Sequence, residues 1–172
     1  GTLLANEEVE LRSEVSGKIT KIYFEEGSLV KRAQMLVKIN DSELQAQLLQ
    51  QKYREELARQ REQRQRELLK GNLISQQEYD VALNELNTVK AGLQLVKAQI
   101  EKTEIRAPFD GTIGLKFVSE GSFISTTTRI ASLQDVNPIK IDFSVPEKYA
   151  GRVQKASAVK FHAQGSGKVL EG

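Results

Sequence analysis

The chain of 172 residues contains no cysteine and a single histidine, His162. The absence of cysteine excludes disulfides, thiolate zinc sites and cysteine nucleophiles, and it fits either a reducing compartment or a periplasmic protein that avoids misoxidation. His162 lies in a strand-like stretch and has no second histidine with which to form a metal site. It is therefore predicted to be an incidental surface or packing residue, and we expect neither an enzyme nor a cofactor or metal.

Net charge is also nearly absent, because 25 basic and 23 acidic residues leave a balance of +2. No strong field therefore points to nucleic acid or to an anionic membrane. The most arginine-rich stretch, Arg59 to Glu67, interleaves glutamates and has no aromatic residue to stack a base, so nucleic acid is not an expected partner. No run of about 18 apolar residues could span a bilayer, and the residues from Gly1 lack a signal-peptide pattern. The chain is expected to be soluble as it stands and to be a piece of a longer protein.

What the sequence does contain is an internal repeat with a constant offset of 94 residues, from Gly17 to Gly111 and from Gly27 to Gly121. Other segments recur at the same offset: Leu11-Arg12 as Ile105-Arg106, Ile19 as Ile113, and Glu26-Gly27-Ser28 as Glu120-Gly121-Ser122. Apolar positions follow it too: Tyr23 with Phe117, Phe24 with Val118, Val30 with Ile124, Leu36 with Ile130 and Ile39 with Leu133. The unbroken register predicts two half-domains that fold together.

Each half is predicted to consist of short strands around glycine turns. In the first copy, strands over Gly17–Phe24 and Met35–Ile39 flank a turn at Glu25–Ser28. No helix start follows the repeated glycines, so a phosphate-binding loop is not expected. We predict instead four structural turn glycines: Gly17, Gly27, Gly111 and Gly121.

The 41–104 segment between the copies predicts a helical hairpin. Strong helix formers without Gly or Pro run from an N-cap at Asp41 or Ser42 to Lys70, and Gly71-Asn72 ends this first helix. Its predicted contacts with the second helix are Leu44, Leu48, Leu49, Tyr53 and Leu57 near the base and Leu68-Leu69 near the turn. The outer stretch Arg59–Glu67 contains only Arg, Gln and Glu, which predicts a solvated, salt-bridged face or one that meets other chains.

The second helix of the hairpin is predicted to start at a capping box formed by Ser75 and Glu78 and to end at about Glu104. Its apolar residues step by three and four, which indicates a heptad seam: Tyr79, Ala82, Leu86, Val89, Leu93, Val96, Ile100 and Thr103.

After Leu133, the alternating segment Val136–Val145 predicts a strand and the start of a further module. This module has too few strands to close a sheet, unless the residues before Glu10 join it. We predict that it is truncated, and either poorly ordered or completed by those residues or by a neighbouring chain.

Duplicated β-rich halves split by a helical hairpin resemble the periplasmic adaptor, or membrane fusion protein, family of tripartite efflux pumps. The half-motifs also resemble biotinyl and lipoyl carrier domains, but a carrier displays a modifiable lysine in a tight turn, whereas Asn40–Leu44 has no lysine and starts a helix. Arg64, Leu68 and Ser75, with the spacing R-x-x-x-L-x-x-x-x-x-x-S, match the tip motif with which these adaptors dock on TolC-type outer-membrane channels.

The resemblance implies an α+β fold in which a lipoyl-like β-sandwich, made of two half-motifs, flanks a long antiparallel α-helical hairpin, with part of a β-barrel domain. The expected organisation is an N-terminal strand of the barrel domain at 1–10, half-motifs at 11–40 and 105–135, the hairpin at 41–104 and a partial barrel domain at 136–172. Ala33 and Thr127 depart from the pattern, because the family often has glycine at these repeat-equivalent positions.

By the same resemblance, the function expected is that of a non-enzymatic periplasmic adaptor. It would link an inner-membrane transporter of the resistance-nodulation-division (RND) class to a TolC-type channel for export of drugs or other small molecules, and would self-associate into a hexameric ring. The membrane-proximal domain and the inner-membrane anchor would be missing from this chain. Three alternatives stay open: an adaptor of an ABC-type exporter, a lipoyl or biotinyl carrier domain with a helical insertion, and a coiled-coil interaction module unrelated to efflux.

Overall fold

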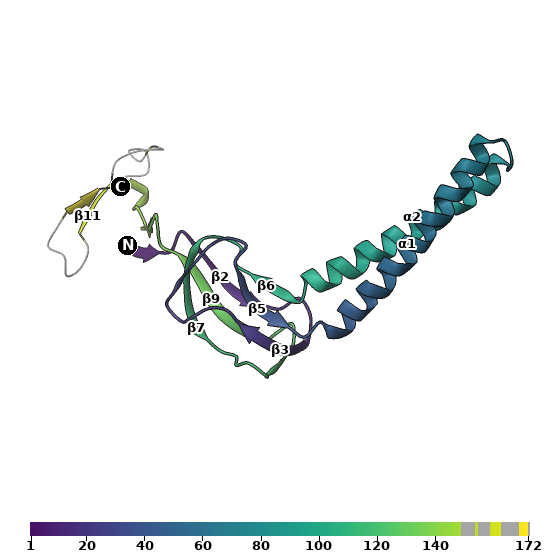
Figure 1. Ribbon diagram of the computed structural model, residues 1–172. Coiled ribbons are helices and arrows are strands. Elements are labelled where there is room, and N and C mark those ends of the chain that lie inside the picture. The colour runs from purple at the N-terminus through teal and green to yellow at the C-terminus, as the bar shows by residue number, and fades with distance from the viewer. Residues whose placement is uncertain (149–153, 155–158, 163–168, 172) are drawn as a thin grey trace. The chain divides into compact units, whose positions relative to one another are not determined.

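A computed structural model describes residues 1–148, 154, 159–162 and 169–171 (Figure 1). The chain divides into two compact units: Ala5–Pro138 forms one, and Gly1–Leu4 together with Ile139–Gly172 forms the other. The larger unit contains the repeat and the hairpin.

The smaller unit joins the two ends of the chain. Strand β1 (Thr2–Leu4) pairs antiparallel with β10 (Lys140–Asp142), so residues before Glu10 do join the C-terminal module. A second antiparallel pair consists of β11 (Lys160–His162) and β12 (Val169–Glu171). The prediction that residues 1–10 form one strand of the barrel domain is corrected by the structure. Only Gly1–Leu4 belong to the smaller unit, and the next strand along the chain lies in the larger unit. The expected strand over Val136–Val145 shortens to β10.

Two four-stranded antiparallel sheets make up the β part of the larger unit. The first has the order β2 (Glu7–Arg12), β9 (Arg129–Asp135), β7 (Gly111–Lys116), β4 (Leu29–Val30). The second has the order β6 (Glu104–Arg106), β5 (Met35–Ile39), β3 (Gly17–Ile22), β8 (Phe123–Ile124). Each sheet draws strands from both halves, and the repeat offset converts the order of the first sheet into that of the second. The halves therefore fold as one body.

Backbone hydrogen bonds show the same pseudo-two-fold symmetry. The amide of Gly27 donates to the carbonyl of Ile113 at 2.9 Å, and the amide of Gly121 donates to the carbonyl of Ile19 at 2.9 Å. An equivalent pair runs from strand amides to glutamate carboxylates: Ile22 N to Glu120 Oε1 at 2.9 Å and Lys116 N to Glu26 Oε1 at 2.8 Å. The repeated Glu-Gly-Ser turn of each half therefore forms hydrogen bonds with the other half.

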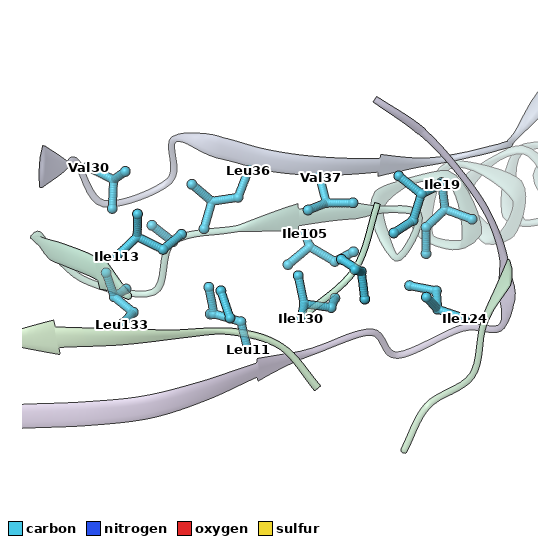
Figure 2. Packing of buried hydrophobic residues seen from close by; sticks show 14 residues of the cluster. Leu11, Ile19, Val30, Leu36, Val37, Ile105, Ile113, Ile124, Ile130 and Leu133 are labelled. Carbon is cyan, nitrogen blue, oxygen red and sulfur yellow. The ribbon is translucent and has the colours of Figure 1, made fainter. Parts of the chain in front are cut away.

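Between the sheets lies one apolar core, shown in Figure 2. Twelve of its fourteen buried residues form repeat-equivalent pairs: Leu11 with Ile105, Ile19 with Ile113, Val30 with Ile124, Leu36 with Ile130, Val37 with Ala131 and Ile39 with Leu133. Burial of each of the larger aliphatic side chains contributes about 1.5–3 kcal/mol. Tyr23 and Phe117, although equally repeated, stay exposed, and the cations of Lys21 and Arg129 lie over their rings.

The four repeated glycines fall into two kinds. Gly27 and Gly121 have φ angles of +76° and +84°, which confirms them as turn glycines because other residues rarely adopt this conformation. The turn prediction is wrong for Gly17 and Gly111, which begin strands β3 and β7. A Cβ at Gly17 would lie 2.6 Å from the Ile39 side chain, and one at Gly111 would lie 2.5 Å from the carbonyl oxygen of Gln134. These two positions need glycine for close packing.

Between β5 and β6 the chain forms the antiparallel helices α1 (Ser42–Lys70) and α2 (Gln76–Glu101). Because β5 and β6 are neighbours in one sheet, the helices leave the sandwich side by side (Figure 1). Helix α2 ends three residues before the expected Glu104, which starts β6 instead. Asp41 occupies the predicted N-cap position of α1 but makes no side-chain cap hydrogen bond.

Candidate functional site

The apolar seam predicted along α2 faces α1. Ala82, Leu86, Leu93 and Val96 are buried, and the other helical members of the heptad pattern are half-buried. Thr103, the last of the series, is buried beyond the end of the helix, where its hydroxyl donates to the carbonyl of Ile100 at 2.6 Å. The pattern therefore identified the packed face of α2 correctly.

The seam of α1 differs from the prediction. Leu49, Tyr53 and Leu57 are 52%, 69% and 48% exposed and do not pack against α2. Steps of three and four from Leu44 and Leu48 lead instead to a mostly polar row of buried and half-buried positions: Gln51, Glu55, Ala58, Glu62, Gln65 and Leu69. At about 100° of rotation per residue, the apolar stripe of Leu49, Tyr53 and Leu57 lies on nearly the opposite side of the helix from this row. Leucine spacing alone could not tell the two stripes apart.

Glu62 is the largest departure from the expected solvated face, because it is only 3% exposed. Its Oε1 atom accepts hydrogen bonds from Arg66 Nε at 3.0 Å, from the second Arg66 guanidinium nitrogen at 2.8 Å and from the Tyr79 hydroxyl at 2.7 Å. The hydrogen bond from Tyr79, aided by Arg66, lowers the pKa of Glu62 although burial opposes this shift. A charged carboxylate thus joins the two helices inside the outer half of the hairpin.

The tip of the hairpin is closed on both sides by hydrogen-bonded caps. At the end of α1, the amide of Asn72 donates to Leu69 O at 2.9 Å and that of Leu73 donates to Leu68 O at 2.9 Å. This is a Schellman motif, and Asn72, not the glycine before it, adopts the left-handed conformation with φ of +54°.

On the other side of the turn, the predicted capping box at the start of α2 is confirmed. The Glu78 amide donates to Ser75 Oγ at 3.2 Å, and the Ser75 amide donates to a Glu78 carboxylate oxygen at 2.8 Å. The Ser75 hydroxyl donates to the same carboxylate oxygen at 2.9 Å. The hydrogen bonds that the Glu78 carboxylate accepts lower its pKa, and the one from the Ser75 backbone amide contributes most. Both helix ends at the turn are therefore capped by hydrogen bonds.

The three residues of the predicted docking motif lie on either side of this turn. Arg64 is exposed and Leu68 is 37% exposed. Four residues apart on one helix, they share a face of α1 and line an open depression together with Gln60, Gln63 and Glu67. Ser75 is exposed and is the N-cap residue of α2, to which its hydroxyl contributes the cap hydrogen bonds.

The base of the hairpin holds an ionic cluster that sequence reasoning did not find. Lys38 Nζ donates to Asp41 Oδ2 at 2.7 Å, to Thr103 Oγ1 at 3.1 Å and to Glu104 Oε1 at 3.1 Å. The cluster joins the end of β5 to both ends of the hairpin, and Arg106 extends it with a 2.7 Å bond to Glu104. Its one sequence signal was Asp41, which reads equally well as a helix cap because capping and ion pairing use the same side chain.

Burial alone would lower the pKa of Lys38, but its hydrogen bonds to Asp41 and Glu104 outweigh this and raise it. Burial likewise opposes ionisation of Asp41, yet bonds from Lys38 and Gln45 hold the pKa of Asp41 below its ordinary value. The pKa of Glu104 is lowered chiefly by Arg106. All three groups are therefore charged near neutral pH.

Over the part of the chain that the structure describes, no helix is long and apolar enough to cross a bilayer.

A duplicated, interlocked sandwich with a helical hairpin inserted between its halves defines the class of barrel-sandwich hybrid folds. The chain belongs to the membrane fusion protein family, the periplasmic adaptors: the family model described as "RND MFP, barrel-sandwich hybrid domain" matches residues 7–134. This confirms the resemblance drawn from the repeat.

Similar proteins carry related names. The multidrug resistance protein MdtA of Klebsiella pneumoniae is 36% identical over 172 residues, which cover 91% of this chain and 42% of that protein. The chain therefore spans about two fifths of the length of this curated relative. A putative efflux transporter from Bacteroides eggerthii has a crystal structure with a TM-score of 0.80 at 28% identity, covering 99% of this chain and 53% of that one.

A MacA-MexA chimeric protein that contains the Pseudomonas aeruginosa MexA α-hairpin domain superimposes with a TM-score of 0.87 at 25% identity. The match covers 99% of this chain and 63% of the chimera. The lipoyl-like sandwich with its helical hairpin, expected from the sequence, is the fold of these adaptors.

Proposed function

We propose that this chain is the sandwich and hairpin core of a periplasmic adaptor for export of drugs or other small molecules. The adaptor would link an inner-membrane RND transporter to a TolC-type outer-membrane channel without catalysing a reaction. The observation that carries this proposal is the match of residues 7–134 to the barrel-sandwich hybrid domain of RND membrane fusion proteins. The full-length protein would reside in the periplasm, anchored to the inner membrane, and the smaller unit would be part of its β-barrel domain.

The hairpin tip is the proposed docking site for the outer-membrane channel. The exposed Arg64 guanidinium offers several donors to carbonyls or carboxylates at the end of a channel's helices. Leu68 has enough exposed apolar surface to enter a shallow notch, and Ser75 adds a polar contact from the other side of the turn. Each contact is worth about 1–3 kcal/mol, so one hairpin binds weakly.

Several hairpins acting together would overcome this weakness through effective concentration. The exposed stripe of Leu49, Tyr53 and Leu57 on α1 supports self-association, because such apolar residues gain when a neighbouring copy covers them. We propose that copies assemble into a ring, hexameric in the assembled pump as the family resemblance implies.

The alternatives receive less support. In a carrier domain the connection after the first half would be a tight turn that displays a lysine, whereas here α1 starts at Ser42, directly after its N-cap position Asp41. The family description names RND transporters, which disfavours an ABC-type exporter, and it disfavours a coiled-coil module unrelated to efflux.

The test is complementation of a strain that lacks the adaptor, with substitutions introduced into the full-length protein. Arg64→Asp reverses the charge at the proposed contact, and Leu68→Ser removes its apolar partner. Both variants are expected to lose efflux-dependent drug tolerance at unchanged adaptor abundance, because the tip lies outside the β core that dominates stability.

The matched control is Arg59→Asp, which reverses the charge of an exposed arginine of the same helix away from the tip motif. Arg59→Asp is expected to retain tolerance. Full tolerance in both tip variants at normal abundance would remove the tip from the mechanism, and equal loss in Arg59→Asp would show that α1 charge in general, not Arg64, is required.

A further inference from the structure

We propose that the hydrogen-bonded cluster of the buried Glu62, the half-buried Tyr79 and the exposed Arg66 sets the register of the hairpin, and thereby determines which residues form its tip. The register assignment stands on the hairpin alone. Its importance for channel docking rests on the function proposed above.

Apolar packing in the middle of the hairpin provides little register preference. Between Leu48 and Leu69 the α1 seam offers α2 a single apolar side chain, Ala58, among polar ones: Gln51, Glu55, Glu62 and Gln65. Alanine is small and fills no distinctive hole in the facing seam. A shift of α1 by one heptad against α2 would exchange similar contacts, because knobs-into-holes packing repeats every seven residues.

The polar cluster distinguishes between these registers. Glu62 and Arg66 belong to α1, so their mutual bonds survive a shift, but the Tyr79 hydroxyl belongs to α2 and its 2.7 Å bond does not. The next seam residues of α2, Ala82 and Leu86, have no hydroxyl to offer. After a shift, a carboxylate that is 3% exposed would lose a donor and face an apolar side chain, which is strongly unfavourable.

A wrong register would alter the tip itself. In an antiparallel hairpin, a heptad shift between the helices moves the turn along the chain by about half a heptad, three to four residues. The turn now lies between Lys70 and Gln76. Moved in one direction it would unwind the turn of α1 that carries Leu68, and moved in the other it would break the Ser75 cap. The cluster therefore acts as a positioning device for the proposed docking residues.

Spin labels can measure the register directly, because the chain has no cysteine of its own. Cysteines replace the exposed Gln63 on α1 and Gln94 on α2, which are offset along the hairpin. A heptad shift changes their axial separation by about 10 Å. Pulsed electron–electron double resonance on the purified chain, with no partner present, then gives the distribution of distances between the two labels. A thermal melt gives the stability of the chain.

The decisive variant is Glu62→Leu combined with Tyr79→Phe, which replaces the cluster by apolar groups. Buried polar groups replaced in this way often leave stability equal or higher, so we expect an unchanged or raised melting temperature together with a second, displaced distance between the two labels. Wild type is expected to give one distance. As a single variant, Glu62→Gln keeps a carbonyl acceptor for Tyr79 and should give one distance, like wild type. Glu67→Leu changes an exposed glutamate of the same helix and should also give the wild-type distance.

A single unchanged distance in the double variant overturns the proposal, whether or not the melting temperature falls. If the double variant does not fold, Tyr79→Phe alone decides by the same criterion, since it removes only the hydroxyl. Because these measurements involve no channel, loss of the tip phenotype in cells and loss of register in the isolated chain are separate results.

Discussion

Ala33 has a backbone conformation that is unfavourable for a residue with a side chain. It adopts a φ of +65°, a left-handed conformation that costs a residue with a Cβ about 1–2 kcal/mol. Contacts with the second half hold it there: its amide donates to Ala107 O at 2.8 Å, and its carbonyl accepts from Arg106 at 2.8 Å. The equivalent residue, Thr127, accepts the symmetric bond from Arg12 at 3.3 Å without a positive φ. The two halves thus share the hydrogen bond from an arginine to this carbonyl, but they differ in the backbone conformation of the residue that accepts it.

Ala33→Gly is therefore expected to stabilise the protein by about 0.5–1 kcal/mol, since glycine adopts this conformation without strain but loses more entropy on folding. Chemical denaturation with the two-state midpoint as readout measures the change. Thr127→Gly is the matched control and should give no gain, because no strain is relieved there. A loss of stability in Ala33→Gly would show that the left-handed conformation is not strained.

At the scale of the elements, the hairpin combines an apolar face on α2 with a mixed face on α1. Leu93 is buried in the α2 seam, and Leu95, two residues further, is exposed on the opposite side of the same helix. Most of the apolar packing between the helices therefore comes from α2 side chains, and α1 supplies the smaller apolar share and the buried carboxylate.

Leu93→Asp places a carboxylate in this seam and is expected to cost about 3–5 kcal/mol of hairpin stability, splaying the helices while the β sandwich survives. Circular dichroism should show a lower melting temperature for the helical signal. Leu95→Asp provides the comparison and should melt like wild type. An unchanged melt for Leu93→Asp would mean that the seam is not buried in solution.

Across the larger unit, the hairpin is bound to the sandwich by the Lys38 cluster, whose side chains are only partly exposed. Asp41 and Glu104 have lowered pKa values, so their stabilising contribution is present above the ordinary carboxylate range, about pH 4, and is lost as pH falls through the folded-state values. Lys38 has a raised pKa, so its contribution is present below its ordinary value of about 10.4 and is lost as pH rises beyond the folded-state value.

Lys38→Met should thus destabilise the protein by about 1–3 kcal/mol at pH 7. The gap between wild type and variant should narrow as pH falls from 5 to about 3, because protonation of Asp41 and Glu104 removes the same interaction from wild type. Thermal melts across this pH series measure it, with Lys70→Met, which removes an exposed surface pair, as the control of small effect. A pH-independent gap would show that the cluster contributes through packing and not through charge.

The sequence by itself determined the repeat, its core pairs and the presence of the hairpin. Core residues such as Ile19 and Ile113 recur at a fixed offset, because equivalent positions of the two half-motifs are buried in the same core. Local hydrogen-bonding rules were equally decisive at Ser75 and Glu78, since a capping box involves only neighbours in the chain.

Only the tertiary structure decided which stripe of α1 faces α2 and what happens to Glu62. A glutamate among arginines has the same local pattern whether it faces water or a tyrosine on the other helix, so its burial depends on a partner 17 residues away. The same holds for Lys38, whose partners on both sides of the hairpin meet only after the helices have folded back. Long-range polar contacts have no periodicity in sequence, whereas apolar faces do, and this is why the core could be predicted and the buried charges could not.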